Sequence, residues 1–301
     1  MSSQKTAVVD YLWDVLQDEG GLRPLTFQDV KKAIEHCNKE LGSSLSSSNP
    51  ANFMKDLLRG ANASKNWPER LAALGISGRQ IKGDNRIFEF VEYADGQTEP
   101  FPSQFEPTGT EQITVLQSVS LPLATKSLGR TDESWLIQVA VNLKVLESHF
   151  ANRSARKVQE VTHLQVGVKL GKSEIDSLFL AVVEGEDGRR LNALITCEAK
   201  QARDPILPDQ IVQQVVAANA SVQKLDLNVS MIIPVAIKAV TGGSIYVVEF
   251  EPWTPEEAST EEESLKELKA HVTGLYELRP PVPGIGFTPT LAKRAPRKPR
   301  V

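Results

Sequence analysis

The pattern of apolar residues divides the chain into two parts, residues 1–94 and the remainder. In residues 1–94 the apolar positions recur with helical spacing, as in TAVVDYLWDVLQ (6–17), and Thr26 with Asp29 predicts a helix N-cap. The pattern then changes to GRQIKGDNRIFEFVEY (78–93), which predicts two strands around a Gly-Asp-Asn turn. We therefore expect a small, mainly helical α+β domain that ends in a β-hairpin.

The remainder of the chain predicts an α/β domain. Residues 95–112 hold three prolines, two glycines and few apolar positions, which is typical of a linker. The predicted elements after it are a helix, three meandering strands, a helix and two further strands: 133–150, 164–170, 175–183, 191–200, 206–223, 229–240 and 244–252. This order predicts a mixed β-sheet flanked by helices over residues 113–280, followed by a Pro-rich basic tail, 281–301.

Composition restricts the class of protein. Of 301 residues, 41% are hydrophobic and 24% are charged, which is typical of a globular chain and excludes a collagen-like or wholly disordered one. No uncharged stretch is long enough to span a bilayer, and no secretory signal is evident. The two cysteines fit a reducing compartment. We therefore expect a cytoplasmic protein without a membrane partner.

Charge leaves room for a local nucleic-acid site. The net charge of −4 argues against a generally basic nucleic-acid coat. The tail KRAPRKPR (293–300), however, holds five Lys or Arg and no acid, so basic residues are unevenly placed.

Two predicted strands bring the main chemical constellation together. Asp176 begins the strand 175–183, and Glu198 and Lys200 end the strand 191–200. Side chains alternate along a strand, so Glu198 and Lys200 share one face. Hairpin pairing through the turn at 184–190 places Asp176 beside that end. Two carboxylates and an ammonium are therefore expected to converge, either as a reactive site or as an ordinary salt bridge at a strand end.

Such a group suits metal-assisted phosphodiester hydrolysis. Mg²⁺ prefers oxygen ligands, which Asp176, Glu198 and the carbonyl of Ala199 can supply. A bound metal polarises phosphate and activates water. Lys200 can orient that water or stabilise charge that develops on phosphorus.

The chain has, in order, a helix, a strand hairpin that runs from EID (174–176) to CEAK (197–200), and a helix that opens with Gln. This order resembles the PD-(D/E)xK nuclease superfamily over residues 130–252. The resemblance implies a metal-dependent nuclease whose core motif is Asp176, Glu198 and Lys200, with Ile175 where the motif name has proline.

The same resemblance implies two further positions in the site. Many members carry an acid on the preceding helix, for which Glu147 is the better candidate here, with Glu160 and Glu174 as alternatives. Several branches also use a Gln on the following helix, where Gln210, Gln213 and Gln214 form one stripe. Gln210, nearest the start of that helix, is the predicted contact, and an ordinary polar helix face is the alternative.

The first domain resembles the outline of a winged-helix module and is expected to contact double-stranded DNA. Cations can bind phosphate while amide side chains read base edges. The candidate residues are Arg59, Lys65, Arg70, Arg79, Gln80, Lys82 and Arg86. A dimerisation or scaffold domain with an ordinary mixed surface is the alternative.

These features favour a Mg²⁺-dependent DNA endonuclease, as the nuclease resemblance implies. A type II restriction enzyme that acts as a homodimer is the first interpretation, because two active sites are needed to cut both strands of a palindrome. A repair, recombination or phage DNA-processing nuclease is the second. A non-enzymatic DNA-binding regulator is the third.

Overall fold

The computed structural model divides the chain into two compact units, Met1–Gln104 and Phe105–Val301. It describes residues 4–59, 63–83, 85–127, 130–170, 173–224, 228–259 and 267–286. The boundary between the units falls inside the predicted linker 95–112. Both sides of that linker pack on their own unit: the Phe101 ring meets Trp67 at 5.1 Å between centroids, and the Phe105 ring meets Phe250 at 4.9 Å.

The first unit is a group of helices with a small antiparallel sheet. Its elements are α1 (Gln4–Asp18), β1 (Leu25–Thr26), α2 (Phe27–Leu41), α3 (Pro50–Arg59), α4 (Ala63–Asn66), α5 (Glu69–Ala73), β2 (Ile76–Gly83) and β3 (Arg86–Glu92). The strand order is β1-β3-β2. Thr26 and Asp29 form a capping box at the start of α2, which confirms the predicted N-cap.

One core joins the helices of the first unit to its sheet. Leu12, Ile34, Met54 and Phe88 are buried in it. Gly78 lies so close to this core that a Cβ there would overlap the rings of Phe88 and Trp67. The helices therefore pack directly on the hairpin β2–β3, which also carries several of the candidate DNA contacts.

The second unit contains a seven-stranded mixed sheet. Its elements are β4 (Ile113–Gln117), α6 (Leu123–Ser127), α7 (Glu133–Asn142), α8 (Val145–Asn152), β5 (Val158–Leu170), β6 (Ser173–Glu184), β7 (Arg190–Lys200), α9 (Pro208–Lys224), β8 (Met231–Val240), β9 (Ser244–Phe250), a 3₁₀ turn (Glu257–Ser259) and β10 (Ala270–Arg279). The strand order is β4-β10-β9-β8-β7-β6-β5, with β7–β8 and β10–β4 parallel. The predicted α/β class with a mixed sheet is confirmed.

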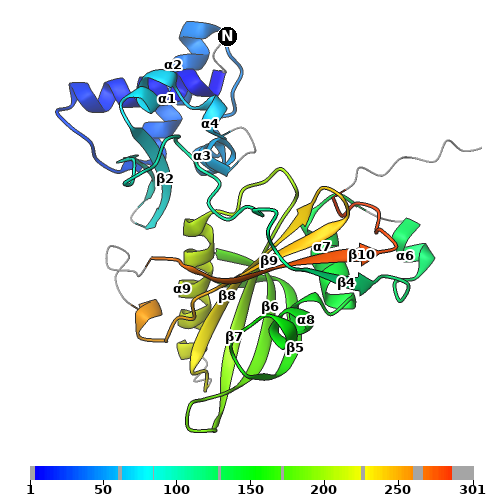
Figure 1. Ribbon diagram of the computed structural model, residues 1–301. Helices are drawn as coiled ribbons and strands as arrows, with labels where there is room; N and C mark the ends of the chain where they lie inside the picture. The colour runs from blue at the N-terminus through cyan, green and yellow to red at the C-terminus, as the bar shows by residue number, and fades with distance from the viewer. Residues whose placement is uncertain are drawn as a thin grey trace, which may run out of the picture. The chain divides into compact units, whose positions relative to one another are not determined.

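Helices cover both faces of this sheet (Figure 1). The α7–α8 face buries alternate residues of β7, among them Ile195, Cys197 and Ala199. The α9 face buries Leu194 with Val215 and Ala218 of the helix. Since β7 is covered on both sides, its polar residues near the carboxyl end lie inside the protein and need internal partners.

The structure departs from two sequence predictions about elements. The predicted helix 133–150 is two helices, because Lys144 adopts a left-handed φ of 56° between α7 and α8. The apolar pattern does not reveal this break, since each half keeps its own buried positions. The sheet also gains β4 and β10, which the sequence pattern did not predict; β10 pairs with both β9 and β4.

Among the described residues, no helix is both long and apolar enough to cross a membrane.

Candidate functional site

The hairpin β6–β7 brings the three predicted residues to one end of the sheet. Its register pairs Ser177 with Cys197, so the next position along each strand sets Asp176 opposite Glu198. Asp176 Oδ2 accepts a hydrogen bond from the backbone N–H of Ala199, at 2.9 Å. The Asp176 carboxylate thereby satisfies the N–H of Ala199 where the ladder between the two strands ends.

Glu198 and Lys200 form a buried ion pair on the face of the sheet that α9 covers. Lys200 Nζ donates to Glu198 Oε1. Glu198 is 1% exposed and Lys200 is 7% exposed. Burial acts to lower the pKa of Lys200, but the carboxylates of Glu198 and Glu133 outweigh it and the pKa is raised. Lys200 therefore remains an ammonium and a hydrogen-bond donor at neutral pH.

Helix α7 supplies a further acid, Glu133, at its first position. Asp132 caps the helix by accepting from the Trp135 N–H at 2.8 Å, and this aims the first turn at the end of β7. Glu133 Oε1 lies 3.2 Å from Lys200 Nζ. Burial raises the pKa of Glu133, and Lys200 opposes that shift.

The predicted helix acid, Glu147, has a different partner. It lies in α8, beyond the break at Lys144, and accepts from Lys144 Nζ at 3.0 Å. The helix acid that contacts the site is therefore Glu133. Its signal in the sequence is an acid that directly follows an N-cap residue, before the strand meander.

The other two acids considered for this role also point elsewhere. Glu160 accepts from the Thr162 hydroxyl at 2.9 Å, on β5. The Glu174 side chain is exposed, although its backbone carbonyl borders the site.

Helix α9 contacts the site through Gln214, which corrects the prediction of Gln210. Gln214 is 1% exposed, and its Nε2 donates to Glu198 Oε2 and, at 3.2 Å, to the Glu174 carbonyl. The loop 201–207 separates β7 from α9, so the helix reaches Glu198 about one turn after Gln210. The side-chain oxygens of Gln210 and Gln214 are both buried, and neither has a hydrogen-bond partner among the described residues.

The site has an excess of acid. Burial raises the pKa of Asp176 to about 8, and the neighbouring Glu198 carboxylate adds to the shift. Asp204 also acts on Glu133 through charge. This group, Asp176, Glu198, Glu133 and Asp204, sets four carboxyl groups against the one ammonium of Lys200. Carboxylates held close together in a poorly hydrated site favour a bound proton or a cation.

The donor set suits a hard divalent ion. Within the described residues no group of three or more His, Cys, Asp or Glu side chains is arranged to hold a metal. The predicted ligands are two carboxylates and a backbone carbonyl, those of Asp176, Glu198 and Ala199, so they need no third acid. Oxygen ligands, the raised pKa of Asp176 and the orphaned oxygen of Gln214 fit Mg²⁺ better than a soft metal.

Cys197 takes no part in this chemistry. It lies on the opposite face of β7, in the apolar core under α7. Burial raises the pKa of its thiol well above the ordinary value, which keeps it protonated.

Two of the predicted DNA contacts in the first unit are already ion-paired. Arg70 Nε lies 2.5 Å from Asp10 and its terminal nitrogen 2.7 Å from Asp14. Arg79 pairs with Glu89 on the neighbouring strand.

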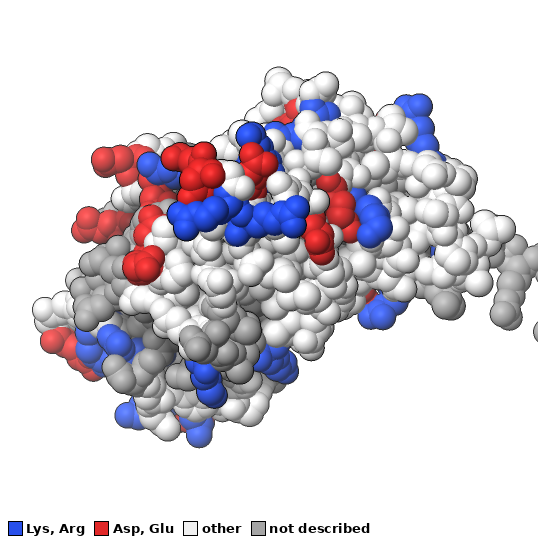
Figure 2. Space-filling model, turned by 90° about the horizontal axis from the view of Figure 1, so that it is seen from below, with Lys and Arg blue, Asp and Glu red and all other residues white. Residues whose placement is uncertain are grey.

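The remaining candidates present a smaller basic surface than the sequence suggests. Lys65 and Arg86 are exposed, Gln80 is partly buried, and the side chains of Arg59 and Lys82 lie outside the described ones. Figure 2 shows one face of the molecule, seen from below relative to Figure 1, on which Lys and Arg side chains are interspersed with Asp and Glu side chains.

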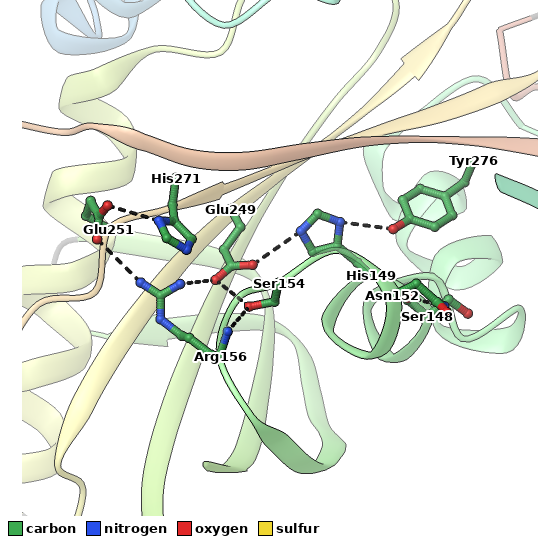
Figure 3. Close-up of polar contacts among 9 residues, drawn as sticks. All are labelled: Ser148, His149, Asn152, Ser154, Arg156, Glu249, Glu251, His271 and Tyr276. Carbon is green, nitrogen blue, oxygen red and sulfur yellow. Dashed lines mark hydrogen bonds and ion pairs between the residues drawn. The ribbon is translucent and has the colours of Figure 1, made fainter. Parts of the chain in front are cut away.

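A second buried polar cluster lies on the α7–α8 face of the sheet (Figure 3). Glu249 of β9 is fully buried and accepts from Arg156 and, at 3.1 Å, from the Ser154 hydroxyl. His149 Nε2 lies 3.4 Å from Glu249 Oε2, and its Nδ1 lies 3.0 Å from the Tyr276 hydroxyl. These contacts tie α8 and the turn that follows it to β9 and β10.

The second cluster pairs its buried acid with a guanidinium, whereas the first cluster has more carboxyl groups than ammonium groups. The buried Glu249 carboxylate faces the Arg156 guanidinium, whose other end lies 3.4 Å from Glu251. His271 approaches Glu251 at 3.0 Å, toward the surface. We therefore interpret this cluster as a structural tie and the acid-rich one as the candidate functional site.

We predict that Asp176→Asn stabilises the metal-free protein at alkaline pH. The pKa of Asp176 is about 8 in the folded protein. It is about 4 in an unfolded chain, so wild-type stability falls as pH rises between these values. The amide removes this dependence and still accepts from Ala199. In EDTA at pH above 8, we expect a gain of at least about 1 kcal/mol, or about 2–4 °C in Tm.

The matched control for that experiment is Asp187→Asn. Asp187 lies in the exposed β6–β7 turn, where hydrogen bonds from Arg189 lower its pKa. The variant should therefore show no alkaline gain in thermal unfolding. An equal gain in stability in both variants, or no gain in Asp176→Asn, would mean that burial does not raise the pKa of Asp176.

We predict that Arg156→Met destabilises the second unit by about 3–5 kcal/mol, because it leaves the buried Glu249 carboxylate without its counter-ion. Urea unfolding measures the loss. Arg156→Met combined with Glu249→Gln should lose less, since neither buried charge remains. Arg189→Met, at an exposed turn, is the control and should unfold as the wild type does.

Comparison with known proteins assigns no family. No protein-family model, no curated protein and no solved structure matches the chain. The support for a function therefore comes from the chemistry of the acid-rich cluster at the end of β6 and β7.

Proposed function

We propose that this chain is a Mg²⁺-dependent endonuclease that hydrolyses phosphodiester bonds in double-stranded DNA, as the PD-(D/E)xK resemblance implies. One observation carries the proposal. Asp176 from β6 lies beside the buried Glu198 and Lys200 of β7 at the end of a hairpin, where Asp176 itself is half-buried. These are the residue types that metal-assisted phosphodiester hydrolysis requires.

The proposed metal ligands are Asp176, Glu198 and the carbonyl of Ala199. When bound, the ion would supply positive charge that polarises the phosphate and lowers the pKa of a water molecule. The excess of carboxyl groups over ammonium groups supports this assignment, because a divalent cation offsets their repulsion.

The proposed roles of the remaining residues follow from their contacts. The Lys200 ammonium donates to Glu198 in the absence of substrate, and it can donate instead to a phosphate oxygen as charge develops there. Gln214 holds the second oxygen of Glu198 and so orients that carboxylate. Glu133, at the more exposed side of Lys200, can accept a proton or contact a ligand-bound water.

The first unit is proposed to be a winged-helix module that contacts DNA. Helices packed on a three-stranded sheet of order β1-β3-β2, with a terminal hairpin, support this proposal. Lys65 and Arg86 are exposed and are proposed as phosphate contacts. Arg70 and Arg79 would exchange an acid for phosphate.

A homodimeric type II restriction enzyme remains the preferred biological role within this proposal. A two-fold dimer would place one site on each strand of a palindrome. A repair, recombination or phage-processing nuclease would use the same chemistry, and a fixed ladder of fragments from plasmid DNA would distinguish the restriction enzyme from it.

A DNA-binding regulator without nuclease activity is the second candidate. One observation favours it: both oxygens of Glu198 are already bound by Lys200 and Gln214. In such a protein the cluster would be a structural ion pair, and DNA binding would persist without cleavage in Mg²⁺.

We predict that the full chain cuts plasmid DNA in Mg²⁺ and not in EDTA. Asp176→Ala should reduce the cleavage rate by at least about 10³-fold, because it removes a metal ligand, and Lys200→Ala by about 10²-fold or more. Gel electrophoresis measures both rates, while Tm confirms folding. Mg²⁺ should also raise the Tm of the wild type but not of Asp176→Ala. Wild-type cleavage by Asp176→Ala would refute the proposal.

We predict that Gln214→Ala slows cleavage more than Gln210→Ala does. Gln214 holds Glu198, whereas the described contacts show no such bond from Gln210. Initial rates of plasmid cleavage over a Mg²⁺ titration separate the two variants, because loss of the Glu198 contact should also raise the Mg²⁺ concentration required. Equal effects would show that Gln214 does not position the ligand.

A further inference from the structure

A buried lysine lies next to Lys200 and outside the predicted motif. Lys238 interrupts the apolar strand β8, MIIPVAIKAV, and is 3% exposed. A buried ammonium requires an acceptor, because the free energy of removing it from water is large. Its acceptor is the Glu106 carboxylate, which forms an ion pair with Lys238 Nζ.

The sheet register places Lys238 beside the acid-rich cluster. β7 and β8 are parallel, and Lys200 is the Cα partner of Lys238. Partners on adjacent strands, about 4.8 Å apart, direct their side chains to the same face. Lys238 is in turn the partner of Tyr246 on β9. Two ammonium groups therefore occupy neighbouring positions on one face, at the carboxyl ends of β7 and β8.

Glu106 belongs to the segment 105–112, which leads into β4. Phe105 anchors this segment through its edge contact with Phe250. Glu111 closes a turn further along by accepting from the backbone of Thr108 and Gly109, at 2.6 and 2.9 Å. Burial raises the pKa of Tyr246 to about 12, and the charges of Glu111 and Glu106 add to the shift. The segment thus sets acidic groups close to the face on which Lys238 lies.

The two members of the ion pair differ in exposure. The Lys238 side chain is 4% exposed, whereas the Glu106 side chain is 39% exposed. An incoming anion would therefore meet the carboxylate first and reach the ammonium by replacing it. Phosphate and carboxylate oxygens are equivalent acceptors for an ammonium, so the buried charge stays paired when one replaces the other.

We propose that Lys238 is a second phosphate-binding cation beside Lys200, and that Glu106 occupies it until a phosphodiester group of DNA takes its place. The proposal rests on the proposed nuclease function and adds a binding position to that site. Glu106 therefore competes with DNA for the Lys238 ammonium, and the protein binds DNA more weakly than it would without this carboxylate.

DNA binding by the full chain in EDTA tests the proposal without any cleavage. Fluorescence anisotropy of a labelled duplex should show that Glu106→Gln lowers Kd by about 3–10-fold, a change of about 0.7–1.4 kcal/mol. The dependence of log Kd on log salt should steepen by about one unit, because a cation that was paired internally now pairs with phosphate. The Gln side chain can still accept from Lys238, which limits the loss of stability.

Two further variants separate this effect from general charge. Glu267→Gln removes the same charge from an exposed acid 3.6 Å from Lys269, and it should change Kd less than twofold. Glu106→Gln combined with Lys238→Met should lose the whole gain, and because it removes both charges of the pair it should remain folded by thermal unfolding. Equal effects of Glu106→Gln and Glu267→Gln would overturn the proposal, as would a gain that survives Lys238→Met.

The result is independent of the cleavage experiment. Tighter binding by Glu106→Gln without any Mg²⁺-dependent cleavage would keep the phosphate position and reject the nuclease. Cleavage with no response to Glu106→Gln would keep the nuclease and reject the role of Lys238.

Discussion

The second unit depends on how the buried carboxyl group of Glu198 obtains hydrogen-bonding partners inside the protein. Glu198 lies where β7 is covered on both faces, so water cannot solvate it and protein groups must. Lys200 follows it by two positions on the same strand, Gln214 reaches it from α9, and Asp176 lies opposite it on β6. The Glu198 side chain therefore fixes the positions of helix α9 and strand β6 relative to β7.

The two buried polar clusters on this sheet differ in how their acids are paired. Around Glu249 the buried acid has a guanidinium as its counter-ion and a hydroxyl as a donor, with an imidazole 3.4 Å away, and the cluster ties helix to strand. Around Glu198 the acids outnumber the ammonium, and burial, with the nearby Glu198 carboxylate adding to it, raises the pKa of Asp176. A buried acid that is paired with a cation favours a rigid structure, whereas an excess of buried acids favours the binding of a positively charged ligand. This difference, more than the residue types, distinguishes a structural tie from a candidate active site.

Lysines at the carboxyl ends of β7 and β8 extend the site across the sheet. Lys200 is paired with acids of the cluster itself, while Lys238 is paired with Glu106, from a segment next to the boundary between the units. Under the proposed function, Glu106 and the acids of the cluster would occupy these ammonium groups where DNA would place phosphates. The proposed DNA binding is compatible with the low net basicity of the chain, because internal carboxylates would be exchanged for external phosphates.

Much of this arrangement is determined by sequence alone. Strand alternation sets Glu198 and Lys200 on one face, and hairpin length brings Asp176 beside them, because both depend only on local backbone geometry. The cap at Thr26 is equally local. Tertiary structure alone decided that Glu133 rather than Glu147 meets Lys200, that Gln214 rather than Gln210 holds Glu198, and that Lys238 lies beside Lys200. Those contacts depend on a helix break, on the angle at which α9 crosses the sheet and on the register of a parallel pair. Each is set by packing between elements far apart in the chain, which no local pattern records.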